Sequence, residues 1–338
     1  NLASLLNVDV DALGMLPNTT QALHRVLNSI DWNKGDELCV PSVEHLSTFH
    51  AAQVLGQRHG VILKTIPSTY GDDDFLERLS STLSDRTKLL VVSQVSSPDG
   101  RRLPVREATD LAHERGIPVA VDGAQAVGVY PVDVSALGCD YYVAGGHKWL
   151  LGPRGTGFVW VAPAQISKFR PDLFPEVSLW QNPDAPTPPF TVRKRVEGHT
   201  YNHALIIGLG HAVRIALEIG LETIEAKVTR LSTLLRNEVS EWKDARILTP
   251  TAPKQSAGIT TLAFDGLDDD GVREVVARLS AEDKVIVKFQ WLSVPAQSGY
   301  SGIRISMAAF NTEQDVKTLV DRLRAKLVDV AGNSLGRA

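Results

Sequence analysis

The first half of the chain alternates short apolar runs with amphipathic stretches, and this alternation constrains the fold more than any other feature. The apolar runs predict strands at Leu38–Val40, Val61–Ile66, Leu89–Ser93, Pro118–Val121, Tyr141–Ala144 and Gly157–Val161. Between them, apolar residues recur at helical spacing, as in Val105-Ala108-Leu111-Ala112. Strands that are apolar throughout and alternate with helices predict a mostly parallel sheet covered on both faces, which is the α/β class.

The second half begins with a long helical pattern from about His203 towards Trp242. It continues with predicted strands and helices at Ile259–Phe264, Gly271–Ser280, Val285–Phe289, Ile303–Ser306 and Glu313–Lys326. This order predicts a small α+β domain built onto the end of a helix. We therefore expect a large α/β domain over residues 1–205, a connecting helix over 206–243 and a small C-terminal α+β domain over 244–338.

Composition excludes several classes of protein. The chain has 338 residues, of which 43% are hydrophobic and 22% charged, and this is ordinary for a globular protein. A net charge of -4 gives no reason to expect nucleic acid or an anionic membrane as a partner. No apolar run approaches the roughly 18 residues of a membrane span, and the N-terminus lacks a signal-peptide pattern.

Cysteine usage indicates a reducing compartment. Cys39 and Cys139 lie among apolar residues, far apart and without a CxxC spacing. We expect two buried thiols rather than a disulfide, a metal site or a nucleophile. The prediction is a cytoplasmic protein without a metal.

Polar residues follow several of the predicted strands, where chemistry collects in parallel sheets. Asp122, Lys148 and Ser96-Ser97 occupy such positions. Lys148 lies in GGHKW, between apolar and glycine-rich neighbours, and burial there would make its amine nucleophilic. A lysine beside a histidine, with a carboxylate on a neighbouring strand end, suits a pyridoxal-phosphate enzyme. The alternatives are a solvated lysine and a turn or helix-cap aspartate.

The stretch from Val121 to Gly157, VDGAQAVGVYPVDVSALGCDYYVAGGHKWLLGPRGTG, resembles the class V branch of the fold-type I pyridoxal-phosphate enzymes. That branch includes cysteine desulfurases, cysteine C–S lyases and isopenicillin N epimerase-like proteins. The resemblance extends from Gly14 to about Leu323. It implies the fold-type I architecture, pyridoxal 5'-phosphate as cofactor, a small amino-acid substrate and a homodimer with shared active sites.

The resemblance also implies roles for particular residues. Lys148 would form the Schiff base and act as general base, and Asp122 would pair with the pyridine nitrogen. Further matching residues are Gln125 at the ring hydroxyl, His45 stacked on the ring, His147 at the phosphate and Arg304 at the substrate α-carboxylate. The planar fork of an arginine suits a carboxylate, although an exposed strand arginine would give the same sequence pattern.

Two further segments match phosphate-binding parts of the family. Thr19 and Thr20, in Pro17-Asn18-Thr19-Thr20, precede a helical run, and a helix N-terminus binds phosphate readily. Asn and Thr are also ordinary helix caps, so this motif is weak alone. Thr200, in Glu197-Gly198-His199-Thr200, matches a threonine that reaches the phosphate of the neighbouring subunit.

The sequence departs from the desulfurase pattern in several places. Gly145 replaces a serine that contacts the phosphate, which implies weaker phosphate binding or another donor. Ser97 replaces an asparagine, and SSPDGRRLPV is closer to the epimerase-like branch. Residues 287–293 contain no cysteine where desulfurases keep their sulfur-accepting thiol. The family's usual N-terminal segment is also absent, so we expect the chain to be part of a longer protein.

These features favour a C–S lyase that cleaves an S-substituted L-cysteine, a conjugate or sulfoxide, by β-elimination in sulfur-containing secondary metabolism. The products would be pyruvate, ammonia and a thiol or sulfenate. Phe289, Trp291 and Trp180 are candidates for lining the pocket, although buried aromatic residues are more often core. The Pro-rich loop 171–190 is as consistent with a surface excursion or dimer contact as with a pocket cover.

Other functions remain open at this point. An amino-acid epimerase would need a second acid or base, for which His199 and Tyr201 are weak candidates. A decarboxylating or transaminating enzyme would use the same residues. A non-catalytic scaffold with this fold is disfavoured by the presence of Lys148, Asp122 and Arg304. A Rossmann dehydrogenase is disfavoured because no GxGxxG motif opens a strand–helix unit.

Overall fold

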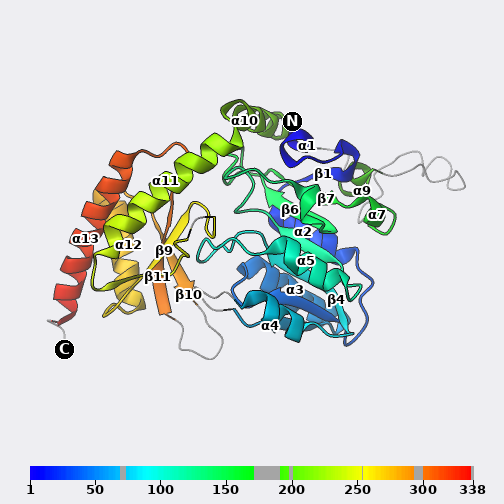
Figure 1. Ribbon diagram of the computed structural model, residues 1–338, viewed down its shortest axis with the longest axis horizontal. Helices are drawn as coiled ribbons and strands as arrows, with labels where there is room; N and C mark the ends of the chain where they lie inside the picture. The colour runs from blue at the N-terminus through cyan, green and yellow to red at the C-terminus, as the bar shows by residue number, and fades with distance from the viewer. Residues whose placement is uncertain (69–73, 171–190, 198–200, 253, 293–299, 336–338) are drawn as a thin grey trace, which may run out of the picture.

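A computed structural model describes residues 1–68, 74–170, 191–197, 201–252, 254–292 and 300–335. Within these residues the chain forms a seven-stranded sheet and a four-stranded sheet, each with its own helices (Figure 1). The larger sheet is mostly parallel and the smaller one antiparallel. The α/β class with a small α+β part was therefore predicted correctly.

The large sheet has the strand order β1-β7-β6-β5-β4-β2-β3. Its strands are β1 (Leu13–Leu16), β2 (Glu37–Pro41), β3 (Ile62–Ile66), β4 (Thr87–Ser93), β5 (Val119–Asp122), β6 (Tyr141–Gly145) and β7 (Gly157–Val161). The strands from β3 across to β6 run parallel, whereas β7 is antiparallel to β6 and β1 is antiparallel to β7. Strand β1 was not predicted, because its four residues show no pattern of their own.

Helices cover both faces of this sheet, which explains why its strands are apolar throughout. On β4, Leu89 and Val91 enter the core beneath α2 (Thr19–Asn28) and α3 (Leu46–His59). The alternate residues Leu90 and Val92 enter the opposite core, which contains apolar residues of α4 and α5. The shorter and peripheral elements of this half are α1 (Leu2–Leu6), η1 (Val10–Ala12), α4 (Phe75–Thr82), α5 (Val105–His113), α6 (Val134–Leu137), α7 (Pro163–Ile166) and α9 (Val192–Val196).

Both cysteines are buried free thiols, as predicted. Burial raises the pKa of the Cys39 thiol to about 12, and it raises that of Cys139 further. A thiol that resists ionisation is a poor nucleophile and a poor metal ligand. The two cysteines therefore serve as core residues of the large domain.

The single long helix expected from His203 towards Trp242 is wrong. The structure has two helices, α10 (His203–Ile219) and α11 (Leu221–Ser240), which meet at an angle of 80°. Gly220 joins them with a φ of +86°, a conformation that glycine adopts at little cost. Among the described residues, no single helix is long and apolar enough to cross a membrane; only this bent pair taken together would be.

The small sheet has the order β10-β11-β9-β8. It consists of β8 (Ala245–Ile247), β9 (Ile259–Phe264), β10 (Lys288–Leu292) and β11 (Tyr300–Ser306), and it packs with α11, α12 (Asp269–Asp283) and α13 (Glu313–Leu335) (Figure 1). Strand β10 begins three residues after the predicted Val285. The reason is that the N–H of Val285 still donates to the carbonyl of Leu279, so Val285 belongs to the C-terminal cap of α12.

The segment after β4 fixes the small sheet to the large one. The Thr261 hydroxyl donates to the Pro98 carbonyl at 2.6 Å, and the Thr249 hydroxyl donates to the Asp99 carbonyl at 2.6 Å. The first hydroxyl comes from β9 and the second from the chain just after β8. These bonds set the small sheet against the carboxyl ends of the parallel strands.

Candidate active site

Polar and charged side chains gather where the parallel strands end. Asp122 is the last residue of β5, and Lys148 follows β6 by three residues. Arg304 reaches the same place from β11 of the small sheet, where it contacts the segment after β4. Burial lowers the pKa of the Lys148 ammonium group; the Asp122 carboxylate opposes this shift, and the Arg304 charge adds to it. The structure therefore brings the predicted lysine, aspartate and arginine into one site.

Asp122 is held in place by its own turn. It is buried, and its Oδ1 accepts a hydrogen bond of 2.8 Å from the backbone N–H of Ala124. The next residue, Gly123, has no room for a side chain, because a Cβ there would lie 1.9 Å from the hydroxyl oxygen of Tyr142. That hydroxyl donates to Gln94 Oε1 at 2.6 Å. Among the described residues no hydrogen bond reaches the other carboxylate oxygen of Asp122, which is therefore available to a partner in the site.

Beside Lys148, Gly145 faces two polar atoms without partners. Thr19 Oγ1 and His147 Nδ1 are both buried and have no hydrogen-bond partner among the described residues. A Cβ on Gly145 would lie 3.1 Å from Thr19 Oγ1 and 3.3 Å from His147 Nδ1, so glycine leaves this space open. Thr19 and Thr20 are the first residues of α2, and N–H groups at a helix N-terminus favour an anion. The arrangement fits a phosphate group.

A hydrogen-bonded chain connects the residue after Lys148 to Arg304. The indole N–H of Trp149 donates to Gln125 Oε1 at 2.8 Å, and Gln125 Nε2 donates to the Ser97 hydroxyl at 3.3 Å. Arg304 Nη1 donates to that hydroxyl at 3.0 Å and to the Ser97 carbonyl at 3.1 Å. Because an indole N–H can only donate, it fixes which end of the Gln125 amide faces Ser97.

His45 is positioned as the N-cap of α3. The backbone N–H of Ser47 donates to His45 Nδ1 at 3.2 Å, so Nδ1 is the acceptor and the ring proton lies on Nε2. Partial burial and the charge of Lys148 lower the pKa of the imidazole. The structure thus presents a neutral, oriented ring at the site.

Glu44 is a site residue that the sequence reasoning missed. Its carboxylate is buried and accepts hydrogen bonds of 2.8 Å from the N–H groups of Ser93 and His45, and another from the Ser93 hydroxyl. Burial, together with the charge of Asp122, raises the pKa of Glu44 to about 7. Its place shortly after the buried strand β2 was the available signal, because it obeys the same strand-end rule as Asp122.

A cavity of about 150 Å³ opens beside these residues. Its lining includes Glu44, His45, Ser97, Lys288, Gln290 and Trp291. Of the predicted aromatic residues, Trp291 lines this cavity, but Phe289 packs under the guanidinium of Arg273, 3.8 Å from its ring centre, and does not. Thr200, His199 and Trp180 lie outside the described residues. The Tyr201 hydroxyl donates to the Met15 carbonyl.

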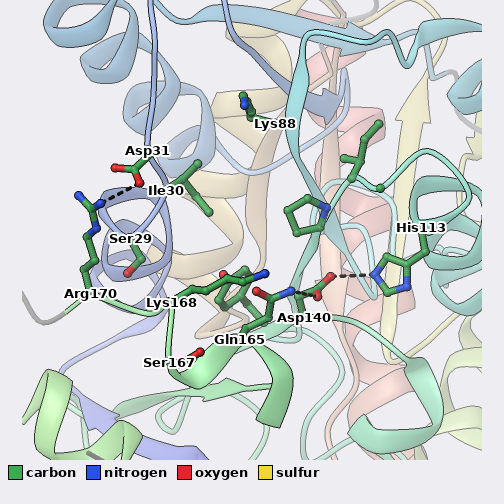
Figure 2. Close-up of a pocket in the computed structure, with 14 residues that line it drawn as sticks. Ser29, Ile30, Asp31, Lys88, His113, Asp140, Gln165, Ser167, Lys168 and Arg170 are labelled. Carbon is green, nitrogen blue, oxygen red and sulfur yellow. Dashed lines mark hydrogen bonds and ion pairs between the residues drawn. The ribbon is translucent and has the colours of Figure 1, made fainter.

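A larger cavity, of about 720 Å³, lies at the opposite edge of the sheet (Figure 2). Lys88, Pro118 and Asp140 place it at the amino ends of β4, β5 and β6. The Asp140 carboxylate is already bonded to the N–H of Val119 at 2.8 Å, to Gln165 Nε2 at 2.7 Å and to His113 Nε2 at 2.8 Å (Figure 2). The carboxylate of Asp140 thus already has hydrogen-bond partners within the protein. The larger volume of this cavity therefore does not mark it as the reactive site.

The fold and this site have the layout of a fold-type I pyridoxal-phosphate enzyme. The family model for aminotransferase class-V matches residues 1–319. The chain belongs to the aminotransferase class-V family. It is 32% identical over 317 residues to a cysteine desulfurase of Yersinia pestis (strain Pestoides F), a match that covers 90% of this chain and 75% of the relative.

Solved structures show the same likeness. The cystine C–S lyase C-DES, in complex with its product cysteine persulfide, has a TM-score of 0.84 at 25% identity over 95% of this chain and 84% of its own. A lysine-to-alanine variant of C-DES carries glycine covalently linked to its pyridoxal-phosphate cofactor. An apo cysteine desulfurase from Thermococcus onnurineus NA1 has a TM-score of 0.83 at 24% identity, over 98% and 82% of the two chains, and this supports the fold alone. Family and neighbours imply pyridoxal phosphate as the cofactor.

The raised pKa of Glu44 predicts a pH-dependent loss of stability. Its carboxyl has an ordinary value of 4.5 and a folded value of about 7, so between these pH values the folded protein keeps a proton that the unfolded chain releases. Stability contributed by the protonated group is complete below pH 4.5 and is lost as pH rises to 7. Each pKa unit corresponds to about 1.4 kcal/mol, which gives a loss of about 3 kcal/mol.

Denaturant unfolding of wild type and Glu44→Gln from pH 4.5 to 7.5 measures this loss as the difference between the two proteins. The free energy of unfolding of the wild type should fall relative to that of the variant across this range. Glu238→Gln, which changes an exposed carboxyl on α11, is the control and should follow the wild type. A constant difference between wild type and Glu44→Gln would contradict the prediction.

Proposed function

We propose that this chain is a pyridoxal-phosphate-dependent C–S lyase that cleaves an S-substituted L-cysteine, a conjugate or sulfoxide, to pyruvate, ammonia and a thiol or sulfenate. The observation that carries the proposal is the grouping of Lys148, Asp122 and Arg304 in a chain whose two cysteines are both buried. Neither of these two cysteines is accessible to keep the released sulfur on its own side chain. The proposed cleavage therefore releases the sulfur product directly.

Each part of the site supports binding of the cofactor. The cradle of Thr19, Thr20 and His147 would hold the phosphate, and Asp122 would pair with the pyridine nitrogen. Gln125 would face the ring hydroxyl, and the neutral ring of His45 would stack on the pyridine. Pyridoxal phosphate supplies an electron sink that stabilises negative charge at Cα of an amino acid. We further propose that Thr200 of a second copy completes the phosphate site.

Lys148 has the properties that the reaction demands of its base. Burial lowers the pKa of its amine, so the uncharged form that attacks a carbonyl and accepts a proton is more populated than in water. Its nitrogen would take the proton from Cα while the electron pair moves towards Cβ and the C–S bond breaks. Sulfur leaves with the bonding pair, and hydrolysis of the remaining enamine yields pyruvate and ammonia.

We propose that Arg304 holds the substrate. Its Nη1 is bound to Ser97, while its Nε is buried and has no hydrogen-bond partner among the described residues. An arginine that is tethered on one side and unsatisfied on the other suits a carboxylate, which accepts charge-assisted hydrogen bonds. We assign the α-carboxylate of the amino acid to this position.

A homodimer is also part of the proposal. On α10, Ile207, Ile215 and Ile219 are 61%, 51% and 51% exposed, which leaves a row of branched apolar side chains in water. Contact with a second copy would cover them and would bring Thr200 to the neighbouring site. Such a pairing fits the homodimer with shared active sites that the family resemblance implies.

The reaction is tested by a proton NMR time course in deuterated buffer with pyridoxal phosphate and S-substituted L-cysteines. We expect pyruvate to appear with the wild type and to be absent with Lys148→Ala, which lacks the base. Exchange of the Cα proton without pyruvate would instead indicate an epimerase or aminotransferase, and an aldehyde product would indicate a decarboxylase. No change with any amino acid would favour a non-catalytic scaffold.

The phosphate cradle makes a separate prediction, because Thr19 supplies a hydroxyl without a partner in the described structure. Thr19→Val keeps the shape and removes the hydroxyl. The dissociation constant of pyridoxal phosphate should rise about tenfold, the scale of a lost hydrogen bond to a charged group. Equilibrium dialysis against pyridoxal phosphate and pyridoxal measures both constants.

Pyridoxal lacks the phosphate and is the matched control. Its affinity should be the same for wild type and Thr19→Val. If the variant loses affinity for both compounds equally, Thr19 does not contact the phosphate and the cradle is wrongly placed.

A further inference from the structure

Lys288 lies next to Arg304 on the face of the small sheet that meets the cavity. It is the first residue of β10, and its Cα partner across the antiparallel pair with β11 is Arg304. Side chains of directly opposite residues point to the same face of a sheet. Lys288 accordingly lines the cavity of about 150 Å³ together with His45 and Ser97.

Lys288 and the carboxyl of Glu44 line the cavity, and two further cations, Arg304 and Lys148, lie close enough to act on Lys288. Lys288 is exposed, but partial desolvation, the charge of Arg304 and that of Lys148 all lower the pKa of its ammonium group. No acidic side chain among the described residues forms an ion pair with Lys288. Like charges opposite each other across a strand pair are destabilising, so this arrangement raises the energy of the protein without a ligand.

The two nearby carboxyl groups do not remove this imbalance. Asp122 acts on the pKa of Lys148, and its proposed partner is the pyridine nitrogen. Glu44 is buried, bonded to Ser93 and His45, and keeps a proton more readily than an ordinary carboxyl. The phosphate of the cofactor belongs to the cradle at Thr19 and His147, which does not line this cavity. One α-carboxylate on Arg304 leaves Lys288 without an anion.

We propose that Lys288 binds a carboxylate at the far end of the substrate's S-substituent, so that the preferred substrate is an S-(carboxyalkyl)-L-cysteine. This inference rests on the proposed lyase function and names its substrate class. Trp291, which is 47% exposed at the cavity, offers an apolar surface to the methylene groups between sulfur and carboxylate. A cavity of about 150 Å³ suits a short chain, because a water molecule occupies about 30 Å³.

The test compares S-(2-carboxyethyl)-L-cysteine with S-(2-carbamoylethyl)-L-cysteine, which have nearly the same size and differ by one charge. For the wild-type holoenzyme, kcat/KM from pyruvate release should favour the carboxylate by about tenfold or more, the scale of a charge-assisted hydrogen bond. Lys288→Ala should reduce this ratio to near one. Lys288→Arg should keep the preference.

Lys317→Ala is the control for the loss of one positive charge, because Lys317 is exposed on α13 in the small domain. It should keep the wild-type ratio. A wild-type ratio near one, or a ratio that Lys288→Ala leaves unchanged, would overturn the assignment. Each result is a ratio of kcat/KM for the two substrates. A variant that loses activity on both substrates equally would leave this ratio unchanged.

Calorimetric binding of the two compounds to Lys148→Ala, which lacks the base, separates this inference from the lyase proposal. Tighter binding of the carboxylate by about tenfold, lost in Lys148→Ala/Lys288→Ala, supports the anion site even if no pyruvate forms from either compound. Equal binding of the two compounds contradicts it even if pyruvate forms.

Discussion

The burial of the Lys148 ammonium group at the ends of the parallel strands is the constraint on which the site depends. Burial lowers the pKa of this amine, and the Asp122 carboxylate opposes the shift. A parallel sheet provides such a position because the carboxyl ends of several strands meet at one edge. Strand β5 ends at Asp122 and strand β6 leads to Lys148, so adjacent strands supply the carboxylate and the amine. The packing of the sheet thereby sets the chemistry of the lysine.

The second constraint is the attachment of the small sheet. Ser97 accepts hydrogen bonds from both Gln125, which follows β5 of the large sheet, and Arg304, which lies on β11 of the small sheet. Pro98 and Asp99, the next two residues, accept hydrogen bonds from Thr261 and Thr249. A short segment after β4 therefore positions both the Gln125 amide proposed for the cofactor ring and the Arg304 guanidinium proposed for the substrate. A displacement of the small sheet would therefore also move Gln125 and, through the hydrogen bond of Gln125 to Trp149, the backbone beside Lys148.

Local sequence was sufficient to predict the features that depend on burial along a single strand. The central strands of the large sheet are covered on both faces, so their apolar runs predicted them correctly. The rule that polar site residues follow the ends of parallel strands predicted the positions of Asp122, Lys148 and Ser97. Glu44 obeys the same rule but was not predicted, because the family resemblance gives a role in this segment to its neighbour His45 instead. The break at Gly220 was missed because the apolar pattern continues through both helices.

Features that depend on contacts between distant segments could not be predicted from local sequence. Strand β1 has four residues and exists because it pairs with β7, nearly 150 positions later. The position of Lys288 beside Arg304 comes from the register of β10 and β11, and the orientation of Phe289 towards Arg273 comes from packing on α12. The cradle around Gly145 joins α2 to β6 across more than a hundred residues.

The measurement that tests the central claim most directly is the position of the covalent link to the cofactor. The holoprotein is treated with borohydride, which fixes pyridoxal phosphate to the amine that holds it, and its peptides are then analysed by mass spectrometry. The account predicts that the label lies on the peptide containing Lys148. A label on Lys288, the other lysine whose pKa is lowered near this cavity, or on any other lysine would contradict it.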